Sequence, residues 1–150
     1  MKLYIKDILR LIRPHQYIKN FFIFMPLFFA GQIGNTELLL NVVIAFVAFS
    51  ITASAIYVLN DYHDIEEDKQ HPKKKYRPLA SGSISKSQAI IIMPVLLVVG
   101  STLMLSLSLK AGEILAAYVV MNIAYSFYLK YVAILDVVII AIGFVLRLFI

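Results

Sequence analysis

The feature that most constrains this chain is a series of long apolar runs separated by short polar segments. The clearest run extends from Leu38 to Leu59 and contains no charged residue. A helix of about 20 mostly apolar residues crosses the hydrocarbon core of a bilayer. Hydrophobic residues make up 61% of the 150 residues, whereas soluble domains contain roughly 45–50% by a similar count. The sequence therefore predicts an all-α fold of about one domain that lies in a membrane.

We expect about five membrane-spanning helices, which form a multi-span transmembrane helical bundle. Their approximate ranges are 17–33, 37–60, 89–109, 114–129 and 132–150. Pro26 should kink the first helix, and the segments "GQIGN" and "KAGE" predict short turns. Because the chain ends inside the fifth apolar run, we expect it to be the N-terminal part of a larger protein. Arg147 would lie at membrane depth, where an arginine normally needs a partner, and the sequence suggests none.

The basic residues predict the orientation of these helices, because cytoplasmic loops carry an excess of lysine and arginine. One side of the predicted membrane carries the basic residues of the N-terminus and of the polar segment 61–88, together with Lys130. The other side carries only Lys110. We therefore expect an integral protein of the cell (plasma) membrane, with the N-terminus and the 61–88 loop in the cytoplasm. This asymmetry accounts for the net charge of +5, so no nucleic-acid partner is expected.

The first 14 residues have an amphipathic pattern. Basic side chains such as Lys6 and Arg10 recur at helical spacing, and Tyr4, Ile8 and Leu11 recur on another face. This pattern predicts a helix over residues 1–14 that lies in the membrane interface and ends at the proline. The alternative is an ordinary polar segment that leads into the first membrane helix.

The segment "NDYHDIEED", residues 60–68, places five carboxylates directly after the second apolar run. If the segment continues that helix at about 100° per residue, one arc of the helix gathers several polar side chains. These are Tyr57, Asn60, Asp61, Asp64 and Asp68. Carboxylates so close together repel each other, and Mg²⁺, which prefers hard oxygen ligands, would relieve that repulsion. The alternative is a solvated helix end whose acids balance the lysines that follow.

The segment "HPKKKYRPLASGSIS", residues 71–85, follows at once and is basic. Arginine binds phosphate oxygens with two hydrogen bonds and lysine binds them as a mobile point charge, so Lys73 and Arg77 are candidate phosphate ligands. Membrane topology alone explains any single lysine here, whereas the place of Arg77 between Tyr76 and Pro78 favours phosphate binding. The "ASGS" turn would let the loop fold back over a site.

Other site chemistries find no support in the sequence. The chain has no cysteine, which excludes disulfides and thiolate nucleophiles. The three histidines, His15, His63 and His71, do not have the spacing of zinc ligands. No base is placed to activate a serine nucleophile.

Together these motifs resemble the UbiA superfamily of intramembrane transferases. Residues 60–68 match its first Asp-rich motif, N-D-x-x-D-x-x-x-D. Within the superfamily, "RPHQYIKN", "HPKKKYRPLASG" and "LDVVIIAIGFVLR" resemble the decaprenyl-phosphate phosphoribosyltransferase branch. The resemblance implies a helical membrane fold around a central cavity and a reaction that transfers a group from a Mg²⁺-bound diphosphate.

The resemblance also implies a donor, an acceptor and roles for residues. In this branch, phosphoribosyl pyrophosphate gives its phosphoribosyl group to a polyprenyl phosphate lipid, and the product feeds arabinose-donor synthesis for the cell envelope. The implied metal ligands are Asn60, Asp64 and Asp68, and the implied catalytic residues are Asp61 and Asp64. The implied substrate-binding residues are Lys19, Tyr57, Asn60, Lys73, Arg77, Tyr125 and Lys130.

Two other functions stay open at this point. The chemistry of the motifs also fits the branch in which a prenyl diphosphate alkylates an aromatic ring, although the basic residues 73–77 favour a phosphoribosyl donor. It could also be a non-catalytic membrane protein or an inactive fragment. Superfamily members have a second half with further site residues, so it stays open whether these 150 residues catalyse a reaction alone. Whether the chain forms a homo-oligomer is a separate open question. A transporter is less expected, because the ionisable residues gather at one membrane face.

Overall fold

The computed structural model describes residues 2–129, 138, 141–143, 145 and 147. The larger helices are α1 (Lys2–Ile12), α3 (Thr36–His63), α6 (Lys86–Leu107) and α7 (Leu109–Ala124). The smaller ones are η1 (Pro14–Phe24), α2 (Met25–Phe29), α4 (Ile65–Gln70), η2 (Lys74–Tyr76), α5 (Pro78–Ser81) and η3 (Tyr125–Leu129). No strand occurs in these described residues, which confirms the all-α prediction.

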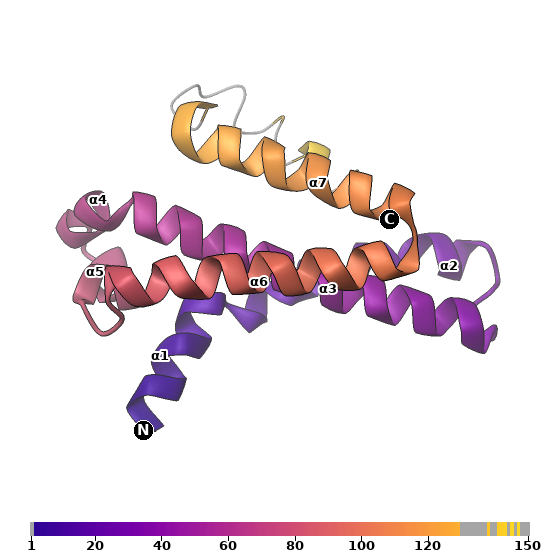
Figure 1. Cartoon of the computed structure of the whole chain (residues 1–150), viewed down its shortest axis with the longest axis horizontal. Coiled ribbons are helices and arrows are strands. Elements are labelled where there is room, and N and C mark those ends of the chain that lie inside the picture. The colour runs from indigo at the N-terminus through magenta and orange to yellow at the C-terminus, as the bar shows by residue number, and fades with distance from the viewer. Residues whose placement is uncertain (1, 130–137, 139–140, 144, 146, 148–150) are drawn as a thin grey trace.

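The centre of the fold is the pair α3 and α6, which lie side by side along the long axis of the molecule (Figure 1). Among the described residues, these are the two helices long and apolar enough to cross a membrane, with 28 and 22 residues. They approach closely at Gly100, where a Cβ atom would lie 2.1 Å from Thr52 Oγ1 and 2.9 Å from the Ala48 carbonyl oxygen. Small residues permit such close contact between membrane helices.

The first predicted span differs from the kinked α-helix that the sequence suggests. It begins as η1, a 3₁₀-helix of 11 residues, and becomes the α-helix α2 at Met25, so Pro26 lies in the first turn of α2. Three residues of a 3₁₀-helix rise about 6 Å, as do four residues of an α-helix. Side chains three residues apart on η1 therefore have the same spacing along the helix axis as side chains four residues apart on α3. Tyr17 Oη lies 2.5 Å from Ser54 Oγ, and Asn20 Nδ2 donates to Ser50 Oγ over 3.0 Å.

The fourth predicted span begins earlier than expected. Ser108 has extended backbone angles between α6 and α7, and its side chain accepts a hydrogen bond of 3.0 Å from the Ala111 backbone N–H. Ser108 is therefore the N-cap of α7. The "KAGE" segment, 110–113, is the first turn of α7, so its prediction as a turn is wrong. The predicted fifth span lies mostly outside the described residues.

Two clusters of buried side chains hold the helices together. The larger joins η1, α3, α6 and α7, and includes Ile23, Phe49, Met104, Leu115 and Tyr118. The smaller packs α1, α4, α5 and the start of α6 around the end of α3, with Leu11, Val58, Ile65, Leu79, Ile84 and Ala89. This second cluster brings the N-terminal helix and the basic loop to the acidic end of α3.

Candidate active site

The acidic segment is not one uninterrupted helix, as the sequence suggests. α3 ends at His63, Asp64 has φ −95° and ψ 11°, and α4 begins at Ile65. The acids of residues 66–68 then occupy the first turn of α4, where negative charge is favourable because of the helix dipole. The break at Asp64 leaves the polar side chains of the segment in two separate groups.

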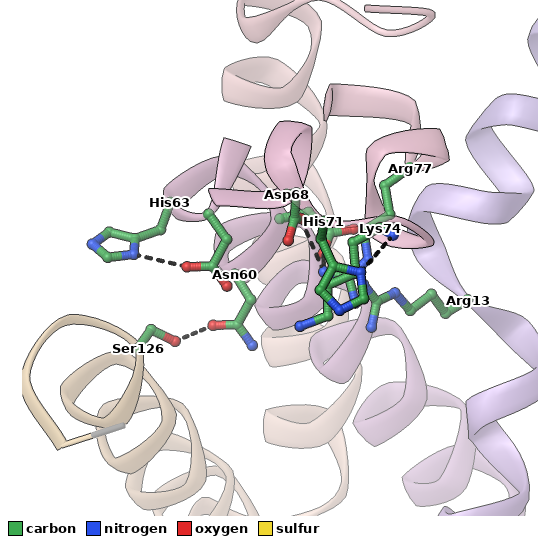
Figure 2. A network of polar contacts seen from close by, with 10 residues as sticks. Arg13, Asn60, His63, Asp68, His71, Lys74, Arg77 and Ser126 are labelled. Atoms are coloured by element: carbon green, nitrogen blue, oxygen red, sulfur yellow. Dashed lines mark hydrogen bonds and ion pairs between the residues drawn. The ribbon is translucent and has the colours of Figure 1, made fainter. Parts of the chain in front are cut away.

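The first group joins two carboxylates to two arginines. Asp61 Oδ1 accepts hydrogen bonds from Arg13 Nη2 over 2.5 Å and from Arg77 Nη1 over 3.2 Å. Arg77 Nη1 also donates to Asp68 Oδ2 over 3.0 Å. Figure 2 shows Arg13, Arg77 and Asp68 gathered on the same side of the site. Both carboxylates are buried, so the arginines neutralise charges that water reaches poorly.

Three segments of the chain position these arginines. Arg13 lies between α1 and η1 with the left-handed angles φ 54° and ψ 60°. Arg77 is the N-cap residue of α5, and its extended backbone suits the residue before a proline. Arg10 Nη2 donates to the Tyr76 carbonyl oxygen over 2.7 Å and so ties the basic loop to α1. The loop thus folds back onto the acids, as the sequence predicts.

The second group lies around Asn60. Ser126 of η3 donates a hydrogen bond to Asn60 Oδ1, and His63 Nδ1 lies 3.2 Å from Asp64 Oδ1. The His63 ring meets the ring of Phe127 edge-on, with centroids 4.8 Å apart. Figure 2 shows Ser126, Asn60 and His63 on the side away from the arginines.

An apolar cavity of about 320 Å³ adjoins this second group. It lies between the end of α3, the start of α6 and η3. Its lining residues are Val58, Leu59, Tyr62, His63, Ala89, Ile90, Met93 and Phe127. The site therefore has polar and apolar regions next to each other.

The remaining predicted substrate-binding residues lie in different places. Tyr57 joins the first group, because the Arg13 guanidinium carbon lies 5.3 Å from the centre of its ring. Tyr125 begins η3 beside Ser126 and is partly buried. Lys19 on η1 and Lys73 in the loop are exposed, and the structure does not join either to the acids. Lys130 lies outside the described residues.

The predicted metal ligands suit a magnesium ion in their chemistry. Within the described ranges, no three His, Asp or Glu side chains are grouped as metal ligands. The predicted set, however, needs only two carboxylates and one amide oxygen, and Mg²⁺ commonly binds one or two carboxylates together with substrate phosphates. Arg77 occupies Oδ2 of Asp68, which leaves Oδ1 for a metal ion. In their chemistry Asn60, Asp64 and Asp68 therefore fit the ion, although Asp68 lies with the arginines and Asn60 with Ser126.

Sequence reasoning missed several polar residues of the interior. It used Arg13 only as a topological charge, and it found no partner for Arg147. The Nε atom of Arg147 donates to Asn20 Oδ1 over 2.9 Å. The Arg147 guanidinium also lies over the ring of Phe49, 4.9 Å from its centre. The Arg13–Pro14 dipeptide after an amphipathic helix was the one local signal for a special backbone position.

Comparison with known proteins places this arrangement in a family context. The model of the UbiA prenyltransferase family matches residues 20–150. Decaprenyl-phosphate phosphoribosyltransferase of Mycolicibacterium smegmatis is 33% identical over 147 residues, which cover 95% of this chain and 46% of that protein. 4-Hydroxybenzoate octaprenyltransferase of Coxiella burnetii is 29% identical over 121 residues, which cover 79% and 42%. The chain thus spans less than half the length of both relatives.

A solved structure has the same helical arrangement. The structure of digeranylgeranylglyceryl phosphate synthase superposes with a TM-score of 0.84 at 24% sequence identity. The match covers 99% of this chain and 52% of that protein. At this level of identity the likeness concerns the fold, and it agrees with the multi-helix membrane fold predicted from the sequence.

Proposed function

Because the chain belongs to the UbiA prenyltransferase family, we propose that it carries part of the site of a Mg²⁺-dependent membrane transferase. The proposed reaction moves 5-phosphoribose from phosphoribosyl pyrophosphate to a polyprenyl phosphate such as decaprenyl phosphate. One observation carries the proposal: the Asp68 carboxylate accepts a hydrogen bond from the guanidinium of Arg77, directly after the end of α3 that carries Asn60. The name of the mycobacterial relative supports the choice of substrates.

The chemistry is a substitution at the ribose carbon C1. The bond from C1 to the diphosphate oxygen breaks, and its electron pair leaves with the diphosphate. A lone pair of the lipid phosphate oxygen forms the new C1–O bond, and inorganic pyrophosphate is released. A dianionic phosphate needs to lose no proton in this step. C1 gains cationic character as the bond breaks, so the main task of the protein is to stabilise the leaving diphosphate.

The residues divide that task between them. Asn60, Asp64 and Asp68 would hold the magnesium ion, which neutralises charge on the leaving diphosphate when bound. Arg77 adds a fixed positive charge beside Asp68. Lys19, Lys73 and Lys130 remain expected contacts of the donor phosphates, and Tyr57 and Tyr125 remain expected residues of the cavity wall. The apolar cavity beside His63 suits the first isoprene units of the lipid.

The location of the reaction follows from the same residues. The polar end of α3 lies with the basic loop, so we place donor binding at the cytoplasmic face of the cell membrane. Phosphoribosyl pyrophosphate is a soluble anion that enters from the cytoplasm, and the lipid acceptor enters from the bilayer.

The test is turnover in membranes that contain the chain together with any coding sequence that follows it. Labelled phosphoribosyl pyrophosphate, decaprenyl phosphate and Mg²⁺ should yield a lipid-linked phosphoribose, which chelation of the metal abolishes. Asp64→Ala should lose this product. Glu66→Ala, which changes an exposed carboxylate of α4 paired only with Lys69, should keep it. Equal activity of both variants would contradict the assigned site.

A second donor separates the proposal from its alternative. The octaprenyltransferase relative favours trial of octaprenyl diphosphate with 4-hydroxybenzoate. Turnover of this pair alone would move the chain to the aromatic branch. Absence of product with both pairs would favour a non-catalytic membrane protein.

A further inference from the structure

Asp61 differs from the other acids of its motif because its carboxylate binds two arginines. It is 2% exposed. Its Oδ1 atom accepts hydrogen bonds from Arg13 and Arg77, which lie 48 and 16 positions away in the chain. Within the part of the chain that the structure describes, its buried Oδ2 atom has no hydrogen-bond partner. Because two guanidinium groups bind its Oδ1 atom, Asp61 is placed to hold the arginines and not as a catalytic residue.

The two arginines, in contrast, reach the surface of the site. Their side chains are 21% and 28% exposed for Arg13 and Arg77. Arg13 uses only Nη2, and Arg77 only Nη1, for side-chain hydrogen bonds within the described residues. A guanidinium has five N–H donors in a planar fork that matches phosphate oxygens. Each arginine is therefore anchored by one nitrogen and keeps the other two for a ligand.

The backbone of Arg13 shows that this anchoring acts against local preference. A residue other than glycine rarely adopts φ 54° and ψ 60°, and such strain persists where the surrounding structure over-determines it. Here the Asp61 carboxylate and the face of the Tyr57 ring hold the side chain. Strain of this kind is concentrated at ligand sites.

We propose that Asp61 is a positioning residue, which holds Arg13 and Arg77 as a clamp for the diphosphate group of the donor. The proposal rests on the proposed function for the identity of the donor, but the ligand class of the clamp is any diphosphate. The charges of the two arginines and of Asp61 and Asp68 cancel, so an anion alone gains little from the empty clamp. A divalent cation bound together with the diphosphate would supply the excess positive charge, and diphosphate binding should therefore require Mg²⁺.

The experiment measures binding of inorganic pyrophosphate to the purified chain in lipid nanodiscs by calorimetry, with and without Mg²⁺. Arg13→Lys keeps the charge and removes the fork, and Asp61→Asn removes the anchor. Each should weaken binding in the presence of Mg²⁺ about 10–100-fold, the usual effect of losing a supporting contact. The double variant should be no weaker than the worse single variant, because Asp61 acts through Arg13.

Matched controls separate the clamp from general charge and from folding. Lys6→Ala removes an exposed cation of α1, and Glu66→Gln removes an exposed carboxylate of α4; both should bind as the unaltered chain does. Thermal unfolding identifies a variant that fails to fold. If Asp61→Asn does not fold, Arg13→Lys decides the question, since it keeps the ion pair with Asp61.

The outcomes distinguish this inference from the proposed function. Unaltered binding in Arg13→Lys, additive losses in the double variant, or no binding to the unaltered chain would overturn the clamp. Pyrophosphate contains neither ribose nor a prenyl chain, so its binding does not depend on which donor the chain uses. If pyrophosphate binding depends on Arg13 and Asp61 as expected but no phosphoribosyl transfer occurs, only the proposed function is contradicted.

Discussion

Arg147 donates a hydrogen bond of 2.9 Å from Nε to Oδ1 of Asn20, 127 residues earlier in the chain. Asn20 is buried and in turn donates to Ser50 Oγ of α3 over 3.0 Å. A single amide thus links η1, α3 and the only arginine predicted at membrane depth. A charged group there requires such partners, because water does not solvate it.

Asn20→Ala should therefore destabilise the fold. A hydrogen bond to a charged group contributes roughly 1.5–3 kcal/mol, and thermal unfolding in detergent should show a loss of that order. Asn41→Ala, an exposed asparagine of α3, is the matched control and should change stability little. Equal unfolding temperatures for the two variants would show that Arg147 does not depend on Asn20.

Gly100→Ala tests the close contact of α3 and α6. The new methyl group would overlap Thr52 Oγ1 and approach the Ala48 carbonyl oxygen, so the two helices must separate. Overpacking of this kind costs about 1–3 kcal/mol, which thermal unfolding would report. Gly112→Ala meets mainly the movable end of the Leu105 side chain and should cost less. If both substitutions have the same effect, the backbone contact at Gly100 is not limiting.

Local sequence patterns predicted α3 and α6, the two described helices that are long and apolar enough to cross a membrane, because length and apolar character decide such helices. They failed at η1, where a distant segment decides the backbone, and at the start of α7, where a local cap does. The 3₁₀ conformation of η1 depends on its match with the serines of α3. The start of α7 depends on its N-cap Ser108, a small polar residue within an apolar stretch. The "KAGE" pattern instead suggested a turn at residues 110–113.

The sequence predicted which acidic residues belong to the candidate site, but not which side chains they contact. The acidic motif pointed to Asn60, Asp61, Asp64 and Asp68 as one face. The break at Asp64 instead leaves Asp61 and Asp68 with arginines, and leaves Asn60 with Ser126. The partner Arg13 lies 48 residues from Asp61 in the chain. No helical spacing reports a contact between segments so far apart.

Single cysteines can determine the predicted orientation, because the chain has none of its own. Lys73 and Lys110 are both exposed and lie in the segments that precede and follow α6. In intact cells, an impermeant thiol reagent should label Lys110→Cys and should label Lys73→Cys only after the cells are opened. Labelling of Lys73→Cys from outside would reverse the topology and place the acidic site on the outer face.

The hydrogen bond from Ser126 to Asn60 suggests how η3 influences the metal site. The hydroxyl donates to Oδ1, the atom through which Asn60 would bind Mg²⁺, and so fixes the position of that atom. Ser126→Ala should raise the Mg²⁺ concentration needed for half-maximal pyrophosphate binding about 10-fold, as expected when a supporting contact of a metal ligand is lost.

The matched control for this change is Ser106→Ala. Ser106 is an exposed serine of α6 whose hydroxyl donates to a backbone carbonyl of its own helix. The control should leave the Mg²⁺ dependence as it is in the unaltered chain. If Ser126→Ala does the same while binding pyrophosphate normally, Asn60 is not a metal ligand. Asp64 and Asp68 would then bind the ion, and the phosphates of the donor would complete its coordination.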